Sequence, residues 1–587
     1  MQKRHIHKKA LELLFYLTII LIFIMPIVSL VRMSFKLDNG YGLANYIELL
    51  QNPRAIQAIK NTVFISVGAA VISLVIGTAM AILVAYTNLK RKRFMEILVL
   101  APFVIPSYII TLSWSRFTMT EGFLNRSLRL LALPAIDIYT LPGIVFILGI
   151  CNAPLVYLIT VNMLRKIPRD MEWAAKVSGY DTRETMLKIN LKLVSPALVS
   201  GGILAFLAAL DNFSVPAFLG ISSGIPVLST YIYEKAISFG PNSFHMAAAL
   251  SIILAVIALS GTVLQSKLLT KNMGLESIKE DYSIRIHLPP KIRIYTEWGC
   301  ISILTFINIA PIIVMIASSF LKTYGAKFRV ENLSLENFKF VFTNRGVLQS
   351  IGNSILLAFI TCFVCILIGT AVAYLKVRRN TKSVMLLESG ASLTYAIPGI
   401  VLSLSMIFYW TMVPNVYGTI KILLIAYVTR YLILQIKGST TAILAVDPAL
   451  EEAAGASGIG RLKKWRKILA PLLLKQTLSS SFLIFVSALT EVTLSSMLSA
   501  AGTKTIGLTI FNLQQAGNYN LSMAMSATTV ALLFFGYLGF FLLEKWQAIN
   551  AAEKKRAFGF LYKSRGHAKN IKNCERSSYE HFDQEYN

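Results

Sequence analysis

QAIKNTVFISVGAA at residues 57–70 is repeated, with substitutions, as QSIGNSILLAFITC at residues 349–362. The same shift of 292 residues carries IGTA at residues 76–79 onto an identical IGTA at residues 368–371. Further along the chain the shift falls to 279 residues, because the loop after the third apolar segment is 13 residues longer in the first copy. Self-similarity at a nearly fixed separation predicts that the fold is built from two copies of one structural unit.

Both copies consist mainly of long apolar segments. Of the 587 residues, 55% are hydrophobic and 15% are charged, which is typical of a membrane protein. The apolar residues fall in runs of about 17–25 residues, long enough to cross a bilayer as helices. We predict twelve spans, at residues 13–31, 62–86, 97–114, 141–164, 196–219, 246–268, 298–320, 354–375, 384–410, 420–436, 477–500 and 523–543. The expected fold class is all-α integral membrane, with about twelve transmembrane helices in two tandem six-helix repeats.

The basic residues indicate the orientation of these spans. Lysine and arginine number 57 against 29 acidic residues, and they cluster just outside the apolar segments. Basic clusters at residues 3–9, 89–93, 376–382 and 460–467 all fall on one side when the spans are counted. Positively charged loops stay in the cytoplasm, so we expect a cell-membrane protein with both termini cytoplasmic. Because topology accounts for the net charge of +28, the lipid bilayer is a predicted partner and nucleic acid is not.

The predicted spans divide the chain into four parts. Residues 1–269 form the first six-span repeat and residues 270–297 form a cytoplasmic linker. Residues 298–545 form the second six-span repeat, and residues 546–587 form a basic cytoplasmic tail. Each repeat crosses the membrane six times, so both copies have the same orientation. We therefore expect a pseudo-twofold axis along the membrane normal.

Two predicted cytoplasmic loops carry the most informative pattern. The first repeat loop, IPRDMEWAAKVSGYDTRETMLKINLKLVSPAL at residues 167–198, follows span four. The second repeat loop, VDPALEEAAGASGIGRLKKWRKILAPLLLKQTL at residues 446–478, follows span ten. Each begins with proline, acidic residues and paired alanines, which favour a short helix with acids near its N-terminus. Gly179 and Gly458 then lie where that helix must end, so we predict a helix–turn–helix projection in both copies.

The second repeat loop carries a recognisable motif. Its run Glu451-Glu452-Ala453-Ala454, followed by Gly458, resembles the EAA loop of binding-protein-dependent ABC importer permeases. The first repeat loop departs from this pattern at Trp173, which replaces the second acidic residue. The resemblance implies that both loops couple the chain to a cytoplasmic ABC ATPase dimer, and that an extracytoplasmic solute-binding protein delivers the solute. The ATPase-coupling residues that it implies are Glu172, Ala175, Gly179, Glu452, Ala454 and Gly458.

The sequence offers no set of residues for catalysis or metal binding. It contains no G-x-x-x-x-G-K-[ST] phosphate loop, so we expect ATP to be used by the partner ATPase. Cys362 and Cys365 have C-x-x-C spacing, but they lie in an apolar run without a neighbouring histidine or further cysteine. We therefore predict a transport subunit that is not an enzyme and has no catalytic residue, metal or cofactor of its own.

Polar residues within the predicted spans are candidates for a solute pathway, because they are costly in a membrane. Asp211 and Asn212 lie in span five and Glu491 lies in span eleven. The 279-residue shift places Asn212 on Glu491, so both copies have a polar group at the same depth. Hydrogen bonding between helices is the alternative interpretation. Weaker candidates are Asn152, Asn162 and Arg430.

The fused two-copy arrangement also bears on the solute. With DNFSVPAFLG at residues 211–220 and TEVTLSSML at residues 490–498, the chain resembles ferric-iron importer permeases, which implies ferric iron as the substrate. Acidic groups in the pathway also favour a cationic or metal-bearing solute. Phosphonate, polyamine, thiamine or sulfate permeases are the alternatives of the same type. An ion-coupled secondary transporter is the alternative from another class, although it would not need two matched cytoplasmic loops.

Overall fold

The computed structural model describes residues 16–37, 40–238, 240, 242–270, 280–379 and 381–564. The basic N-terminal residues, residues 271–279 of the predicted linker and residues 565–587 of the predicted tail lie outside this set. The chain divides into two compact units, Met1–Val530 and Ala531–Asn587. The described part of the second unit is the continuation of one helix, α26 (Tyr519–Ser564).

The described residues of the first half are mainly helical. A helical segment from Tyr16 to Ser34 includes a π-helical stretch (Ile20–Ile24) and α2 (Met25–Ser34), and a hairpin of β1 (Lys36–Leu37) and β2 (Gly40–Tyr41) follows. The remaining helices are α3 (Ala44–Gln51), α4 (Pro53–Tyr86), α5 (Lys92–Val104), α6 (Ser107–Phe117), α7 (Phe123–Leu130), α8 (Leu141–Arg165), α9 (Arg169–Val177), α10 (Thr182–Thr185), α11 (Leu191–Asp211), α12 (Leu228–Ile237) and α13 (Ser243–Thr270). Two further π-helical stretches are Met186–Asn190 and Pro216–Gly220.

The second half repeats this order. Its helices are α14 (Pro290–Asn308), α15 (Ala310–Ser318), α16 (Glu336–Thr343), α17 (Arg345–Arg379), α18 (Lys382–Ala396), α19 (Gly399–Trp410), α20 (Ile420–Leu444), α21 (Pro448–Ala456), α22 (Arg461–Lys464), α23 (Ala470–Leu489), α24 (Thr493–Leu498), α25 (Ile506–Gln515) and α26. A short 3₁₀ helix (Val330–Asn332) and a π-helical stretch (Trp465–Leu469) complete it. The all-α fold class is thereby confirmed.

The number of spans differs from the predicted twelve. Among the described residues, nine helices are long and apolar enough to cross a membrane, or up to eleven if each of two bent helix pairs is one span. The remaining predicted span corresponds to α20, which is a 25-residue helix but is not in that group. It carries three basic residues, Lys421, Arg430 and Lys437, along an otherwise mainly apolar helix.

Four spans that we predicted to be continuous are interrupted. Helices α5 and α6 meet at an angle of 104°, and α18 and α19 meet at 115°. In both pairs a proline, Pro106 or Pro398, is the N-cap of the second helix, and the residue before a proline disfavours helical geometry. The predicted spans at 196–219 and 477–500 likewise stop early, with α11 ending at Asp211 and α23 at Leu489. Proline and polar side chains therefore break helices that hydrophobicity alone would continue.

The repeat is visible in helix packing. In the first half α4 packs along α8, and in the second half α17 packs along α20. Each contact includes a glycine at the same repeat position, Gly77 or Gly369. A Cβ atom on Gly77 would lie 2.8 Å from the Ala153 carbonyl oxygen, and one on Gly369 would lie 2.8 Å from Cγ of Gln435. Small residues at these positions let the helices of each half approach closely.

The first helices of each half pack against the other half. Helix α2 of the first half packs against α19 of the second half, and α15 of the second half packs against α6 of the first. Helix α14 also packs against α5. Each bent pair is therefore covered by a helix from the other half, which joins the halves through reciprocal contacts.

Two helices extend past the segment boundaries that we predicted. The second half begins its first helix at Pro290, within the linker that we predicted to extend to residue 297. Helix α26 continues through residue 546, where we predicted the tail to begin, and ends at Ser564. Both predicted segments were assigned from polarity, and polar sequence can continue a helix beyond its apolar core.

We predict that Gly77→Ala lowers the free energy of unfolding in detergent by about 1–3 kcal/mol, because the new methyl group overpacks the contact between α4 and α8. Gly352→Ala is the control, since Gly352 is an exposed position in α17 with no atom within 4 Å of the added Cβ. Alanine there should be neutral or stabilising by up to about 1 kcal/mol. Equal effects of the two substitutions on thermal unfolding would show that the close approach is not a stability constraint.

Candidate functional site

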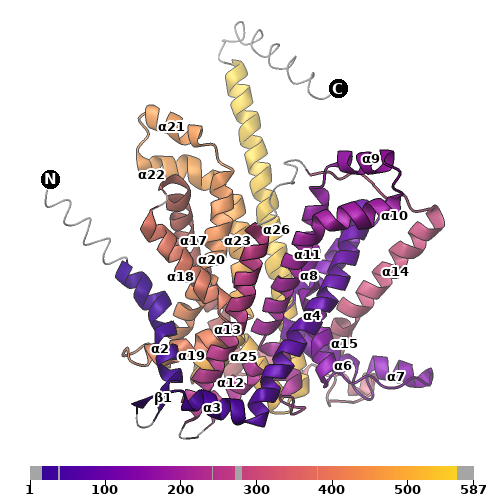
Figure 1. Ribbon diagram of the computed structural model, residues 1–587, viewed down its shortest axis with the longest axis vertical. Coiled ribbons are helices and arrows are strands. Elements are labelled where there is room, and N and C mark those ends of the chain that lie inside the picture. Colours follow the sequence, from indigo (N-terminus) through magenta and orange to yellow (C-terminus); the bar gives the residue numbers. More distant parts are fainter. Residues whose placement is uncertain are drawn as a thin grey trace, which may run out of the picture. The chain divides into compact units, whose positions relative to one another are not determined.

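The two repeat loops form the same local structure. Helices α9 and α21 lie at the same end of the first unit in Figure 1. Gly179 and Gly458 follow them with positive φ angles of +88° and +70°. The next residue in each loop donates its backbone N–H to an alanine carbonyl of the helix. Tyr180 donates to Ala175 at 3.1 Å, and Ile459 donates to Ala454 at 3.0 Å. This hydrogen-bond pattern is a glycine-terminated helix end, so the predicted turns are confirmed.

The predicted contact residues fall on opposite faces of these helices. Glu452, Gly179 and Gly458 are exposed. By contrast, Glu172 is 6% exposed, and Ala175 and Ala454 are each 4% exposed. The Glu172 carboxylate is engaged inside the chain, where it accepts hydrogen bonds from Asn190 and Arg285. The two buried alanines pack their helices against the body of the protein.

An acidic residue at the same repeat position of each loop is an internal anchor. Glu172 accepts hydrogen bonds from Asn190 Nδ2 and Arg285 Nη1, both at 2.6 Å. Its counterpart 279 residues later, Glu451, accepts from Tyr374, Arg378 and Lys464 at 2.7–3.0 Å. Burial raises the pKa of the Glu451 carboxyl, but these hydrogen bonds outweigh burial and leave the pKa below its ordinary value. Both carboxyl groups thus hold a loop helix in place.

Apolar side chains dominate the outward faces of these helices. On α9, Met171 and Trp173 are 39% and 53% exposed, and Val177 is 90% exposed. Leu450 on α21, the counterpart of Met171, is 49% exposed. The Trp173 ring lies 5.3 Å from the Arg169 guanidinium and occupies the position of Glu452 in the second loop. Exposed apolar surface on two matched projections is typical of a protein interface.

The pathway candidates meet in a cavity of about 280 Å³ between the two halves. From the first half it is lined by Pro106, Ser107, Tyr108, Ala208, Asp211, Asn212, Phe213 and Ser214. From the second half it is lined by Tyr395, Arg430, Tyr431, Ser487, Thr490, Glu491, Val492 and Thr493. Three of the four helix breaks described above line this cavity, and the fourth, between α18 and α19, is hydrogen-bonded to its lining residues Asp211 and Arg430. The structure therefore brings Asp211, Asn212 and Glu491 together, as the repeat pattern predicts.

Asp211 joins the two halves across the cavity. Its Oδ1 accepts the backbone N–H of Gly399, the first residue of α19, at 2.7 Å. Its Oδ2 accepts a charged hydrogen bond from Arg430 Nη2. The unpaired N–H groups and dipole at a helix N-terminus favour a carboxylate there. Arg430 also donates to the Ile397 carbonyl at 3.0 Å and so satisfies a backbone group that the break after α18 leaves free.

Asn212 and Glu491 share one local role. Each accepts the backbone N–H of the residue three positions later, Val215 at 3.0 Å and Leu494 at 2.8 Å. Asn212 also donates to Ser107 Oγ at 3.0 Å, and Glu491 accepts from the Tyr431 hydroxyl. These groups therefore make hydrogen bonds at the broken helix ends, and they also line the cavity.

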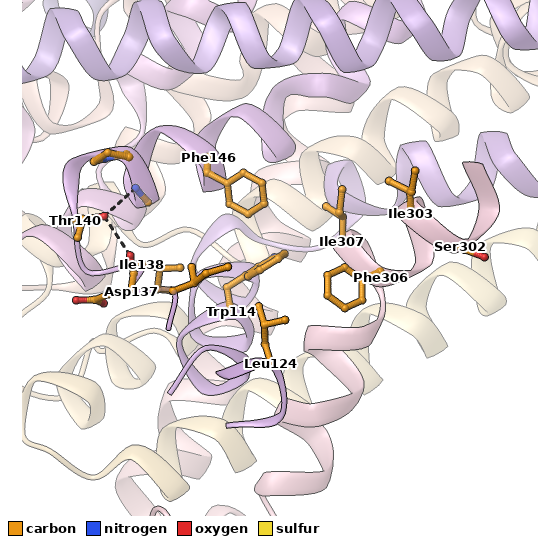
Figure 2. Close-up of a pocket in the computed structure, with 13 residues that line it drawn as sticks. Trp114, Leu124, Asp137, Ile138, Thr140, Phe146, Ser302, Ile303, Phe306 and Ile307 are labelled. Atoms are coloured by element: carbon orange, nitrogen blue, oxygen red, sulfur yellow. Dashed lines mark hydrogen bonds between the residues drawn. The ribbon is translucent and has the colours of Figure 1, made fainter. Parts of the chain in front are cut away.

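A larger groove of about 780 Å³ lies elsewhere (Figure 2). Trp114, Phe146 and Phe306 form its aromatic walls, between α6, α8 and the second-half helix α14. Asp137, Thr140 and Ser302 supply polar groups to its lining. The groove is mainly apolar, whereas the smaller cavity holds the charged candidates, so polarity rather than volume identifies the candidate pathway.

Sequence reasoning underrated part of the cavity. Arg430 ranked below Asp211 although the two form its central ion pair, and Tyr395 and Tyr431 were not singled out. The useful signal was the pair Pro106 and Pro398, which match under the 292-residue shift and mark the helix breaks. Asn152 is buried within α8, and Asn162 is exposed on the same helix. Among the described residues, no group of three or more His, Cys, Asp or Glu side chains is placed to hold a metal ion.

Comparison with known proteins gives a consistent result. The sequence model of the family described as "Binding-protein-dependent transport system inner membrane component" matches residues 73–272 and again 365–548. The two matches begin 292 residues apart, which is the shift of the internal repeat. Together they cover more than half of the chain.

Individual relatives resemble one half or both. The ferric transport system permease protein FbpB of Actinobacillus pleuropneumoniae is 23% identical over 534 residues, which are 89% of this chain and 77% of that protein. A putative ferric transport system permease protein of Haemophilus influenzae is 24% identical over 84% of this chain and 78% of its own length. A putative 2-aminoethylphosphonate transport system permease protein of Salmonella choleraesuis is 25% identical over 40% of this chain and 84% of its own length.

We predict that Asp211 and Arg430 are energetically coupled. In a double-mutant cycle of Asp211→Ala and Arg430→Ala, unfolding free energies in detergent should give a coupling of about 1–3 kcal/mol, because either single change leaves the other charge without its partner. The pair Glu121 and Arg129 is the control, since both side chains are about half exposed. Their coupling should stay below about 1 kcal/mol. Additive effects at Asp211 and Arg430 would contradict the ion pair as a joint between the halves.

Proposed function

Because the chain belongs to the family of binding-protein-dependent transport system inner membrane components, we propose that it carries ferric iron across the cell membrane as the permease of an ABC importer. Membership makes the chain a multi-pass transport subunit with two copies of the family's domain. The proposal adds the solute, the two partners and the roles of individual residues. The partners are a cytoplasmic ATPase dimer, which uses ATP, and an extracytoplasmic solute-binding protein.

The similarity to ferric permeases supports ferric iron as the proposed solute. Two relatives that extend over 89% and 84% of this chain bear the name of ferric transport permeases. They match both halves and the linker region, whereas the phosphonate relative matches 40% of the chain. A 2-aminoethylphosphonate permease is therefore the second candidate of the same type.

The charge of the cavity supports a cationic or metal-bearing solute. Arg430 and Asp211 neutralise each other in an ion pair. Glu491 is a second acidic residue in the lining, beside the single cation Arg430, and it accepts hydrogen bonds from Tyr431 and Leu494. Since a low-dielectric surrounding strengthens the field of a carboxylate, the cavity favours positive charge. An oxyanion such as phosphonate would be repelled by the same group.

The repeat loops support coupling to a partner ATPase. Their helices project from one end of the first unit and expose apolar side chains, while Glu172 and Glu451 anchor them to the protein body. A force applied to α9 or α21 would therefore be transmitted to the helices behind it. Because Asp211 ties the first half to α19 and Arg430 of the second half, relative motion of the halves must change the cavity. An ion-gradient transporter would have no use for two such projections.

We predict that the turn after α21 is required for coupling. Gly458→Val should strongly reduce ATP-dependent uptake by the reconstituted complex, because a β-branched residue disfavours the +70° φ angle at this position. Gly458→Asn is the matched control, since asparagine tolerates positive φ and should retain most activity. Co-purification of the ATPase with each variant measures docking. Full uptake by Gly458→Val would count against the second repeat loop as a coupling element.

We also predict that Glu491 influences the solute rather than assembly. Glu491→Gln keeps an oxygen acceptor for the Leu494 N–H but removes the negative charge, so uptake of ferric iron should fall while the complex still assembles. Glu121→Gln in an exposed outer segment is the control and should leave uptake unchanged. Ferric, phosphonate and polyamine solutes are compared in the same proteoliposomes. Uptake of phosphonate but not iron by the unmodified complex would overturn the proposed solute, and unchanged kinetics in Glu491→Gln would remove Glu491 from the pathway.

A further inference from the structure

The described part of the linker is fastened to the first half of the protein. The N–H groups of Arg285 and Ile286 both donate to the Tyr86 carbonyl at 2.9 Å, where α4 ends. The Asp281 N–H donates to the Arg165 carbonyl at 2.7 Å, and Leu288 exchanges hydrogen bonds with the side chain of Asn88. Backbone pairing on this scale holds residues 281–288 in one register against the first half.

This register places the Arg285 side chain behind the first repeat loop. The side chain is 2% exposed, and its Nη1 donates to Glu172 Oε1 at 2.6 Å. Its Nη2 donates to the carbonyl of Ile167, the first residue of that loop, also at 2.6 Å. The guanidinium carbon lies 4.4 Å from the centre of the Tyr86 ring, and Nη1 also donates to the Tyr86 hydroxyl at 3.0 Å. The planar donor fork of arginine thus joins the loop's start to the carboxylate of α9.

The second repeat loop contains the same pair of bonds. Arg378 Nε donates to Glu451 Oε1 at 2.8 Å, and Arg378 Nη2 donates to the Val446 carbonyl at 3.1 Å. Glu451 and Val446 are the residues 279 positions after Glu172 and Ile167. In each loop, one guanidinium therefore donates hydrogen bonds to two equivalent acceptors.

The two arginines come from different parts of the sequence. Arg378 belongs to α17, and the residue at its repeat position in the first half, 292 residues earlier, is Tyr86 in α4. The first half thus has no arginine at this position of the helix, and the linker supplies one from outside the repeat. Tyr86 remains in contact with that arginine through its ring and its hydroxyl.

We propose that Arg285 is the positioning residue of the first repeat loop and that the linker is a working part of the coupling machinery. This inference rests on the proposed coupling function of α9 and α21. Arg285 holds Glu172, and through it α9, at the angle from which the loop meets the ATPase. Without Arg285 the buried carboxylate of Glu172 loses its cationic partner, and α9 loses the bond that fixes it to the loop's start.

The test relocates the guanidinium to the place that it has in the second half. In the complete importer, Arg285→Ala should lower the amount of solute transported per ATP hydrolysed several-fold. Adding Tyr86→Arg, which copies the position of Arg378, should restore that ratio. Lys291→Ala is the matched control, because Lys291 is an exposed basic residue at the start of α14. A residue with a merely structural role would change the yield of complex but not the transport-to-ATP ratio of the complex that forms.

Each outcome decides the inference. If Arg285→Ala reduces the yield of complex, recovery of yield and coupling by Tyr86→Arg supports it, and failure of Tyr86→Arg to restore coupling overturns it. Normal coupling in Arg285→Ala overturns it as well. Gly458→Val distinguishes a failure of the role of Arg285 from a failure of the proposed coupling function. If Gly458→Val loses uptake while Arg285→Ala couples transport to ATP hydrolysis normally, the proposed coupling function still holds. Normal uptake in both variants would overturn the coupling function itself.

Discussion

A membrane interior requires every backbone N–H and C=O group to find a hydrogen-bond partner within the protein. Four helix breaks in this chain would leave such groups free. Three of them line one cavity, and the fourth is hydrogen-bonded to its lining residues. Side chains supply the missing bonds: Arg430 donates to the Ile397 carbonyl, and Asn212 and Glu491 accept backbone N–H groups beyond their helices. The polarity of the cavity is therefore a direct consequence of breaking helices where water is scarce.

The two halves repeat their geometry more faithfully than their chemistry. Gly77 and Gly369 allow the same close helix contact, and Gly179 and Gly458 end the same loop helix. In the cavity, however, the position after α11 carries an amide and its counterpart carries a carboxylate, Asn212 against Glu491. Backbone geometry must be kept for the helices within each half to pack, whereas the side chains that face the cavity can differ. Two similar halves can thus form a pathway of unequal charge.

Much of the architecture was predictable because it depends on local or periodic features. Apolar runs located the spans, and the repeat predicted that Asn212 and Glu491 would lie at equivalent depths. The continuous spans were wrong because hydrophobicity does not report helix direction, and Pro106 and Pro398 redirected two of them. The burial of the Glu172 side chain and its ion pair with Arg285 were not predicted either. A motif does not indicate which side of a short helix faces the protein.

The sequence by itself determined that this chain is a helical membrane protein of two repeats, each with a loop helix that ends at a glycine. It could do so because length, hydrophobicity and left-handed turns are properties of contiguous residues. Only the tertiary structure decided which distant groups meet. Asp211 reaches Arg430 across 219 positions, and Arg285 reaches Glu172 across 113. Such pairs depend on how helices cross and on where the linker is fastened. The residues between the two members of each pair give no local indication of the helix crossings or of the linker's position, since that geometry arises from packing of the whole unit.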